Sequence, residues 1–338
     1  TAALRAEDAA DGFSRPKLVA EDRASGADVI GDGVILDAAN DLTIDRDRAW
    51  VPHADRSGRA KPDFGVCTEA LASVRVAADG VNDVVPVGCP VAGEEGGWKR
   101  GFNSVTHRPL FAFCNPELTF TVSKYQTGCG TVDIMMHTLE RYLGGKTKDT
   151  ALTDRIAEGL LKAVIEAGAA ADRNPEDYEA RATLMWAGSL SHNDLTGLGR
   201  DVMMQVHQLE HELSGMYPAI AHGAGLSALF CSWARYVCKE DVERFAQLAV
   251  RVWNVDMNFE NPMKTALEGI DRMENFFRSL GMPVSIRELN AGVRKEDLEE
   301  MADKCNLRGK RVLPGIKVLD KKEMVDIFLF IQNLNSRQ

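Results

Sequence analysis

The sequence predicts a two-part fold, with an α/β domain over residues 1–123 and an all-helical domain over residues 124–338. Short segments rich in Val, Ile and Leu, separated by Gly, Pro and Asp, precede Lys124 and are typical of strands and turns. Helix-capping signals and amphipathic periodicity dominate after it. A length of 338 residues also suits two domains better than one.

Composition narrows the class of protein. The longest nearly apolar run, Gly225 to Trp233, is far shorter than the roughly 20 residues of a membrane span. No cationic and then apolar secretion signal follows Thr1, so we expect a cytosolic protein. A net charge of −10 disfavours nucleic acid or an anionic membrane as the main partner and favours a small-molecule substrate. The seven cysteines form no C-x-x-C pair and are expected to be reduced packing residues.

The first domain should contain short strands joined by turns. Gly31 and Gly33 follow an apolar segment and precede a helix-compatible run from Ile35, so the expected order is strand, glycine turn, helix. That order is the context in which a backbone can bind a pyrophosphate. The predicted strands are Ala27 to Ile30, Val84 to Gly88 and Leu110 to Cys114.

Caps and apolar stripes mark the helices of the second domain. Asn174-Pro175 and Asn261-Pro262 each place a capping side chain before a proline, which predicts a helix start at both positions. The second of these helices should stop at Gly281. Its buried face is predicted to be Leu267, Ile270, Met273 and Phe277. Other predicted faces are Leu152, Ile156, Leu160 and Val164; Val242, Phe245, Ala249 and Val252; and Met324, Ile327 and Ile331 after a capping box of Asp320 and Glu323.

Two stretches of the helical domain concentrate histidines and a carboxylate. Asp133 and His137 lie four apart, as do His207 and His211, and His222 follows the second pair after a turn. On helices, each pair shares one face and can reach a single ion. The spacing alone leaves open whether these are ordinary hydrogen-bonded pairs or ligands of one metal. A set of one carboxylate and three imidazoles suits Zn²⁺ or Fe²⁺ rather than Ca²⁺ or Mg²⁺.

The other three histidines, His53, His107 and His192, have no partner at ligand spacing. We expect them at the surface or in ordinary hydrogen bonds.

These stretches resemble a known enzyme family. Gly128 to Tyr142, His207 to Gly223 and Asn115 to Thr119 are similar to the iron-containing (group III) alcohol dehydrogenases, especially bacterial butanol dehydrogenases and NADPH-dependent aldehyde reductases. The similarity extends from Trp98 to about Leu289. It implies a dehydroquinate synthase-like fold, with a Rossmann-like dinucleotide-binding domain that begins later than in the family, an all-helical metal-binding domain, and a homodimer.

The resemblance also implies roles for individual residues. The metal ligands would be Asp133, His137, His207 and His222, and the ion Fe²⁺ or Zn²⁺. His211 would stand near the nicotinamide and substrate and act in catalysis.

Cofactor contacts follow from the same resemblance. Lys99 and Leu118 stand where the family usually touches its NAD or NADP. Because a carboxylate would repel a diphosphate, the side chain of Asp32 is expected to point away from it. The family's glycine loop corresponds to the stretch that contains Gly31, Asp32, Gly33 and Asp37.

The implied function is hydride transfer between NAD(P)H and a small alcohol or aldehyde, with the metal polarising the substrate oxygen. Two alternatives stay open. One is a metal-dependent hydrolase or lyase that activates water, with Glu210 or Glu212 recruited as base, although both are expected to be surface or interdomain groups. The other is a helical scaffold with a structural metal.

Overall fold

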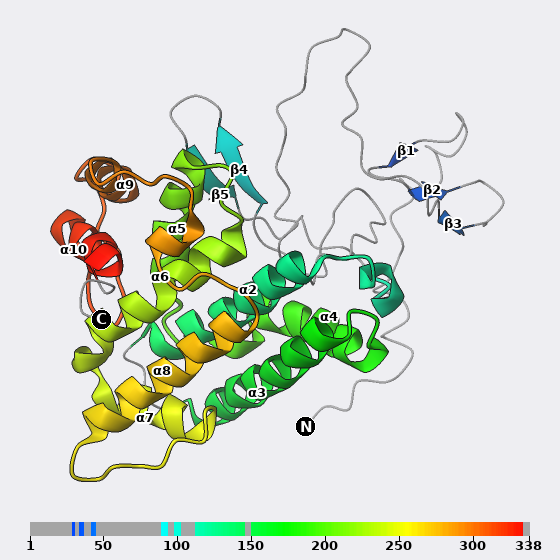
Figure 1. Cartoon of the computed structure of the whole chain (residues 1–338), viewed down its shortest axis with the longest axis horizontal. Helices are drawn as coiled ribbons and strands as arrows, with labels where there is room; N and C mark the ends of the chain where they lie inside the picture. Colours follow the sequence, from blue (N-terminus) through cyan, green and yellow to red (C-terminus); the bar gives the residue numbers. More distant parts are fainter. Residues whose placement is uncertain are drawn as a thin grey trace, which may run out of the picture.

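The computed structural model describes the backbone of five strands within residues 29–102 and the chain over residues 112–145 and 150–333 (Figure 1). Three of the strands form an antiparallel sheet in the order β1-β2-β3, and the other two form an antiparallel pair. The strands are β1 Val29–Ile30, β2 Val34–Leu36, β3 Leu42–Ile44, β4 Cys89–Gly93 and β5 Trp98–Phe102.

The strands correct part of the prediction for the first domain. A helix was expected from Ile35, but β2 is a strand that turns back on β1, with Val29 opposite Ile35. Of the predicted strand Leu110 to Cys114, residues 112–114 lie outside any strand, and Val84 to Gly88 falls outside the described residues. Every strand pair in the described part is antiparallel, so the parallel sheet of a Rossmann-like domain is not among these elements.

Helix α2, Lys124–Leu143, begins where the sequence pattern was predicted to become helical; the division of the chain into two domains at this point stays a prediction. The Oγ of Ser123 accepts the N–H of Gln126 at 3.2 Å and caps the first helix. In chain order the helices are η3 Pro116–Thr119, α2 Lys124–Leu143, α3 Ala151–Arg173, α4 Tyr178–His192, η4 Leu195–Gly197, α5 Gln205–Met216, α6 His222–Val237, η5 Cys238–Glu240, α7 Val242–Arg251, α8 Pro262–Ser279, η6 Ile286–Leu289, α9 Asp297–Cys305 and α10 Lys321–Asn333. Within the described residues, no helix is both long and apolar enough to span a membrane.

Helices α2 and α6 form the centre of this domain (Figure 1). Helix α2 packs against α3, α4 and α6, while α6 packs against α2, α5, α8 and α10. Helix α6 is buried at every position from His222 to Ala234, including the large side chains of Phe230 and Trp233, as a core helix requires. At Gly223 the two helices approach so closely that a Cβ would collide with the carbonyl oxygen of Cys129. A glycine at this position therefore lets the start of α6 reach the middle of α2.

The predicted start and stop of α8 are confirmed. It begins at Pro262 and is followed by Gly281 with a φ of +71°. Ile270, Met273 and Phe277 are buried as expected, whereas Leu267 is 37% exposed. The capping box before α10 is also confirmed, because Asp320 and Glu323 each accept the other's backbone N–H at 3.0 Å.

The helix start predicted at Asn174-Pro175 is wrong. The Oδ1 of Asn174 accepts the N–H of Glu176, which closes an Asx turn between α3 and α4. Helix α4 begins at Tyr178 instead, and the carboxylate of Asp177 caps it by accepting the N–H of Ala180 at 3.0 Å. On α3, Leu160 and Val164 are buried as predicted, whereas Leu152 is 75% exposed. Ala157 and Leu161 complete the buried face.

Candidate metal centre

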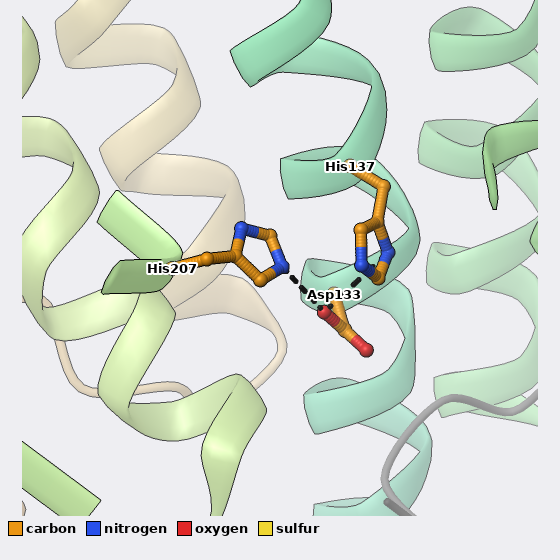
Figure 2. Close-up of side chains that lie close together, drawn as sticks. All are labelled: Asp133, His137 and His207. Carbon is orange, nitrogen blue, oxygen red and sulfur yellow. Dashed lines mark ion pairs between the residues drawn. The ribbon is translucent and has the colours of Figure 1, made fainter. Parts of the chain in front are cut away.

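Three helices bring the predicted ligands together. Asp133 and His137 lie one turn apart on α2, and His207 comes from the first turn of α5 (Figure 2). His222 is the first residue of α6 and reaches the same place because of the close approach at Gly223.

The Oδ1 atom of Asp133 is the common point of this cluster. The imidazole nitrogens His207 Nε2, His137 Nδ1 and His222 Nε2 lie 3.4, 3.6 and 3.8 Å from it. Both Asp133 Oδ1 and His207 Nε2 are buried and have no hydrogen-bond partner. Leaving such atoms unpaired in the interior is costly.

A divalent cation fits this arrangement. Ligand atoms that share one Zn²⁺, each about 2.0–2.2 Å from the ion in a tetrahedron, are roughly 3.3–3.6 Å apart. The separations around Asp133 Oδ1 resemble these spacings and are long for hydrogen bonds. The donor atoms of Asp133, His137 and His207 all lie within 4.8 Å of one another, and His222 completes the set from the side of α6.

The electrostatics of the cluster favour cation binding. Burial lowers the pKa of His222 to about 3 and holds the pKa of His137 well below its usual range, so both imidazoles are neutral, which is the form that binds metal. Burial also lowers the pKa of His207, but the nearby carboxylates of Glu140 and Asp133 outweigh it and raise the pKa to about 9. The negative potential that attracts a proton to His207 attracts a metal cation for the same reason.

Glu140 supports His207 from the far side of its ring. It lies on the same face of α2 as Asp133 and His137, at positions i, i+4 and i+7. Its carboxylate accepts the backbone N–H of Val206 at 2.5 Å and of His207 at 3.1 Å, and its Oε2 contacts His207 Nδ1. Because an ionised carboxylate only accepts, Nδ1 carries the proton and Nε2 faces Asp133. The sequence interpretation missed Glu140, although its i+7 spacing was a usable signal.

Glu210 has the corresponding contact with His222. Its Oε2 contacts His222 Nδ1, and it lies three residues after His207 on α5. Glu210 and Glu212 were expected at the surface or between domains, and both are buried. Glu210 pairs with Lys99 of β5, a strand of the predicted first domain, which agrees with a position between the domains. Burial raises the pKa of Glu210 to about 7, even though the ammonium of Lys99 opposes this shift.

His211 stands beside the ligand cluster. Its ring centroid is 5.3 Å from that of His222 and 6.5 Å from that of His207. It is only partly buried, and its donor atoms group with those of Glu210 and His222 rather than with Asp133. Its expected place near the nicotinamide and substrate stays a prediction.

His192 accepts an ordinary hydrogen bond, as was expected, and its ring also stacks on the cluster. Its ring lies parallel to that of His137, with centroids 4.0 Å apart and an interplanar angle of 19°. The guanidinium of Arg141 donates to His192 Nδ1 at 3.3 Å. No spacing rule links these residues, because the contact joins α2 to the end of α4. His53 and His107 lie outside the described residues.

Comparison with known proteins identifies the family. A model described as "Fe-containing alcohol dehydrogenase family, C-terminal" matches residues 127–330, which is more than half of the chain. The chain belongs to the Fe-containing alcohol dehydrogenase family. The family resemblance stated from the sequence, and the helical character expected of the C-terminal part, are thereby confirmed.

Individual family members are similar over the same region. The NADH-dependent butanol dehydrogenase A of Clostridium acetobutylicum is 38% identical over 231 residues, which cover 68% of this chain and 58% of the relative. The NADPH-dependent aldehyde reductase YqhD of Escherichia coli is 33% identical over 226 residues, covering 62% and 57% of the two chains. The crystal structure of NADH-dependent butanol dehydrogenase A from Thermotoga maritima superposes with a TM-score of 0.67 at 29% identity, over 73% of this chain and 62% of that one. The chain thus matches less than two thirds of these relatives' length.

The residues predicted to contact the cofactor lie in different parts of the chain. Lys99, on β5, turns its ammonium toward Ser214 and Glu210, and its side chain is 12% exposed. Leu118, on η3, is 43% exposed. Gly31, Asp32, Gly33 and Asp37 lie outside the described residues.

Proposed function

We propose that this chain is a metal-dependent alcohol dehydrogenase or aldehyde reductase that transfers a hydride between NAD(P)H and a small alcohol or aldehyde. The observation that carries the proposal is the convergence of three imidazole nitrogens on the buried, unpartnered Oδ1 of Asp133. The printed names of the relatives, butanol dehydrogenase and aldehyde reductase, support the reaction type.

Asp133, His137, His207 and His222 would hold the metal, and this donor set suits Fe²⁺ and Zn²⁺. A divalent ion at this position supplies a Lewis acid that stabilises negative charge on the oxygen of the reacting substrate. The chain contributes the orientation of the ligands, because Glu140 and Glu210 contact the Nδ1 atoms of His207 and His222 and leave each Nε2 facing Asp133. Burial of the cluster excludes water from all but its outer edge.

His211 is proposed as the catalytic group that exchanges a proton with the substrate oxygen. An imidazole changes its charge near neutral pH, and the ring of His211 lies next to the ligand rings while remaining partly exposed. Its position outside the Asp133 group is consistent with proton transfer rather than metal binding.

The nucleotide site is proposed to include Leu118 and the turn formed by Gly31, Asp32 and Gly33, together with Asp37. The family resemblance supports these residues, and Lys99 remains a predicted contact of the cofactor. The names of the relatives include both nucleotides, since the butanol dehydrogenase is NADH-dependent and the aldehyde reductase is NADPH-dependent. Replacing Gly33 with Leu is expected to raise the cofactor dissociation constant at least tenfold, or about 1.4 kcal/mol, with unchanged metal content. Unaltered cofactor affinity would remove this turn from the site.

A hydrolase or lyase that activates water is less well supported. It requires a carboxylate base that can reach a water, but Glu210 is fully buried and its carboxylate already contacts His222 and Lys99. A purely structural metal is also disfavoured, because the relatives in this family are named as dehydrogenases and reductases.

The decisive experiment is nicotinamide absorbance at 340 nm with butanal after loading the protein with Fe²⁺ or Zn²⁺. We expect NADH or NADPH oxidation that requires the metal and disappears in His207→Ala. Metal-loaded wild-type protein with no nicotinamide-dependent turnover of any small aldehyde or alcohol would refute the proposed activity.

A homodimer and a cytosolic location complete the proposal. The family resemblance supports the homodimer. Light scattering of the purified chain and cell fractionation test them.

A further inference from the structure

A second group of potential metal donors lies beside the first. The donor atoms of Glu210, His211 and His222 fall within 4.8 Å of one another. His222 links this group to the cluster around Asp133, since its Nε2 lies 3.8 Å from Asp133 Oδ1 and its Nδ1 contacts Glu210. The proposed metal ligands account for the first group but leave the second without a role.

The ammonium group of Lys99 reaches this second group. The Nζ atom of Lys99 lies 3.5 Å from Glu210 Oε2, 3.3 Å from His222 Nδ1 and 3.1 Å from Ser214 Oγ. Lys99 is carried by β5, which packs against α5, so the β4–β5 pair delivers the ammonium to the metal centre. A positive charge at this place disfavours a second metal ion through repulsion.

The donor and acceptor properties of the groups show which of these contacts of Lys99 are hydrogen bonds or ion pairs. A lysine ammonium only donates and an ionised carboxylate only accepts. When the Glu210 carboxylate is ionised, His222 Nδ1 donates to it and cannot accept from Lys99 as well. The ammonium therefore bonds to Ser214 and pairs with Glu210, and its proximity to the imidazole results from their shared carboxylate partner.

We propose that Lys99 is a positioning residue of the metal centre, which holds the Glu210 carboxylate against His222 Nδ1 so that Nε2 faces Asp133. The role rests on the proposed metal site and is distinct from contact with the nicotinamide cofactor. Lys99 acts through Glu210, in the manner of outer groups that orient metal-binding histidines. A strand outside the helical domain thereby sets the geometry of a ligand at the start of α6.

The test compares Lys99→Met, Lys99→Arg and wild type in the absence of nucleotide. Zn²⁺ affinity is measured by competition with a chelator, and ligand geometry by the visible spectrum of the Co²⁺-loaded protein. We expect Lys99→Met to weaken Zn²⁺ binding about tenfold or more and to alter the Co²⁺ spectrum. Lys99→Arg, which keeps the charge, should recover most of both. Lys124→Met is the matched control, because Lys124 is 61% exposed and pairs only loosely with Asp172 at 3.9 Å.

A double-mutant cycle shows whether Lys99 acts through Glu210. In the Glu210→Gln background, adding Lys99→Met should change Zn²⁺ affinity less than twofold, since the partner charge is already gone. The cycle also separates a positioning effect from a general folding defect. A folding defect caused by Lys99→Met would lower Zn²⁺ affinity in addition to the loss caused by Glu210→Gln.

Two results would overturn the proposal. One is a Lys99→Met protein with wild-type Zn²⁺ affinity and Co²⁺ spectrum, whether or not its nucleotide affinity falls. The other is an effect of Lys99→Met that persists in full beside Glu210→Gln. Failure of the proposed function gives a different result, namely wild-type protein that binds no divalent metal or, when loaded, shows no nicotinamide-dependent turnover.

Discussion

Glu140 and His207 are joined at two points, although they lie on different helices. The Glu140 Oε2 atom accepts the backbone N–H of His207 at 3.1 Å and also contacts the Nδ1 of its ring. The start of α5 has no capping side chain of its own, so the carboxylate from α2 serves as its cap. Because α2 also carries Asp133, one helix provides a ligand and sets the orientation of a second ligand on its neighbour.

Replacing Glu140 with Gln should therefore weaken both metal binding and folding. The amide keeps the size of the side chain but loses the charge that holds His207 and caps α5. We expect Zn²⁺ affinity to fall about 10- to 100-fold and the free energy of unfolding of the metal-free protein to fall by about 1–3 kcal/mol. Glu158→Gln is the control, since Glu158 is also buried but bonds to Tyr142 and Arg251 away from the centre. It should lower stability and leave Zn²⁺ affinity unchanged, and equal Zn²⁺ affinities for both variants would count against the role of Glu140.

His207 and His211 should differ in their effect on metal content. His207 lies in the Asp133 group, whereas His211 lies outside it. We expect His207→Ala to lose most of its bound metal, and His211→Ala to keep it while turnover falls. Elemental analysis and steady-state kinetics of the two purified variants measure this. Loss of metal from His211→Ala with retention in His207→Ala would reverse the two assignments.

Gly223→Ala should disturb the centre through helix packing. The added methyl group would meet the carbonyl oxygen of Cys129 and push the start of α6 away from α2, taking His222 with it. We expect the free energy of unfolding to fall by about 1–3 kcal/mol, with weaker metal binding. Gly159→Ala is the matched control, because nothing lies within 4 Å of the added Cβ on α3. It should be stabilising by about 0.5–1 kcal/mol, and similar melting temperatures for the two variants would contradict the packing argument.

Stability should decrease in acid through Asp154. Burial raises the pKa of this carboxyl group, but the guanidinium groups of Arg244 and Arg200 outweigh it and bring the pKa below its usual value. Both arginines contact Asp154, with Arg244 donating to it at 2.5 and 2.7 Å. A carboxyl group whose pKa is lower in the folded state contributes stability above its unfolded pKa of about 3.9. That contribution is lost as the pH falls through the lower, folded pKa.

Urea unfolding between pH 6 and pH 3 measures this loss. The midpoint of wild type should fall toward that of Asp154→Asn as the pH decreases, because the variant has no carboxylate to protonate. A constant difference between the two proteins over this range would show that Asp154 does not supply the acid sensitivity.

Several features of the fold and the centre could be predicted from the sequence. The change to a helical pattern near Lys124, the start of α8 at Pro262 and the capping box of Asp320 with Glu323 all depend on hydrogen bonds or steric limits within a few residues. The pairing of Asp133 with His137 depends only on the repeat of an α-helix. Neighbouring residues determine local periodicity and local hydrogen bonds, so these features could be predicted without a structure.

Only the tertiary structure decided the contacts between distant segments. The stacking of His192 on His137, the cap that Glu140 places on α5, and the approach of Lys99 to Glu210 each join elements far apart in the chain. Local rules also failed at Asn174, where an Asx turn competes with a helix cap for the same side chain. Which face of a helix is buried, and which side chain meets another, depends on how whole helices pack, and short-range sequence patterns carry little information about that packing.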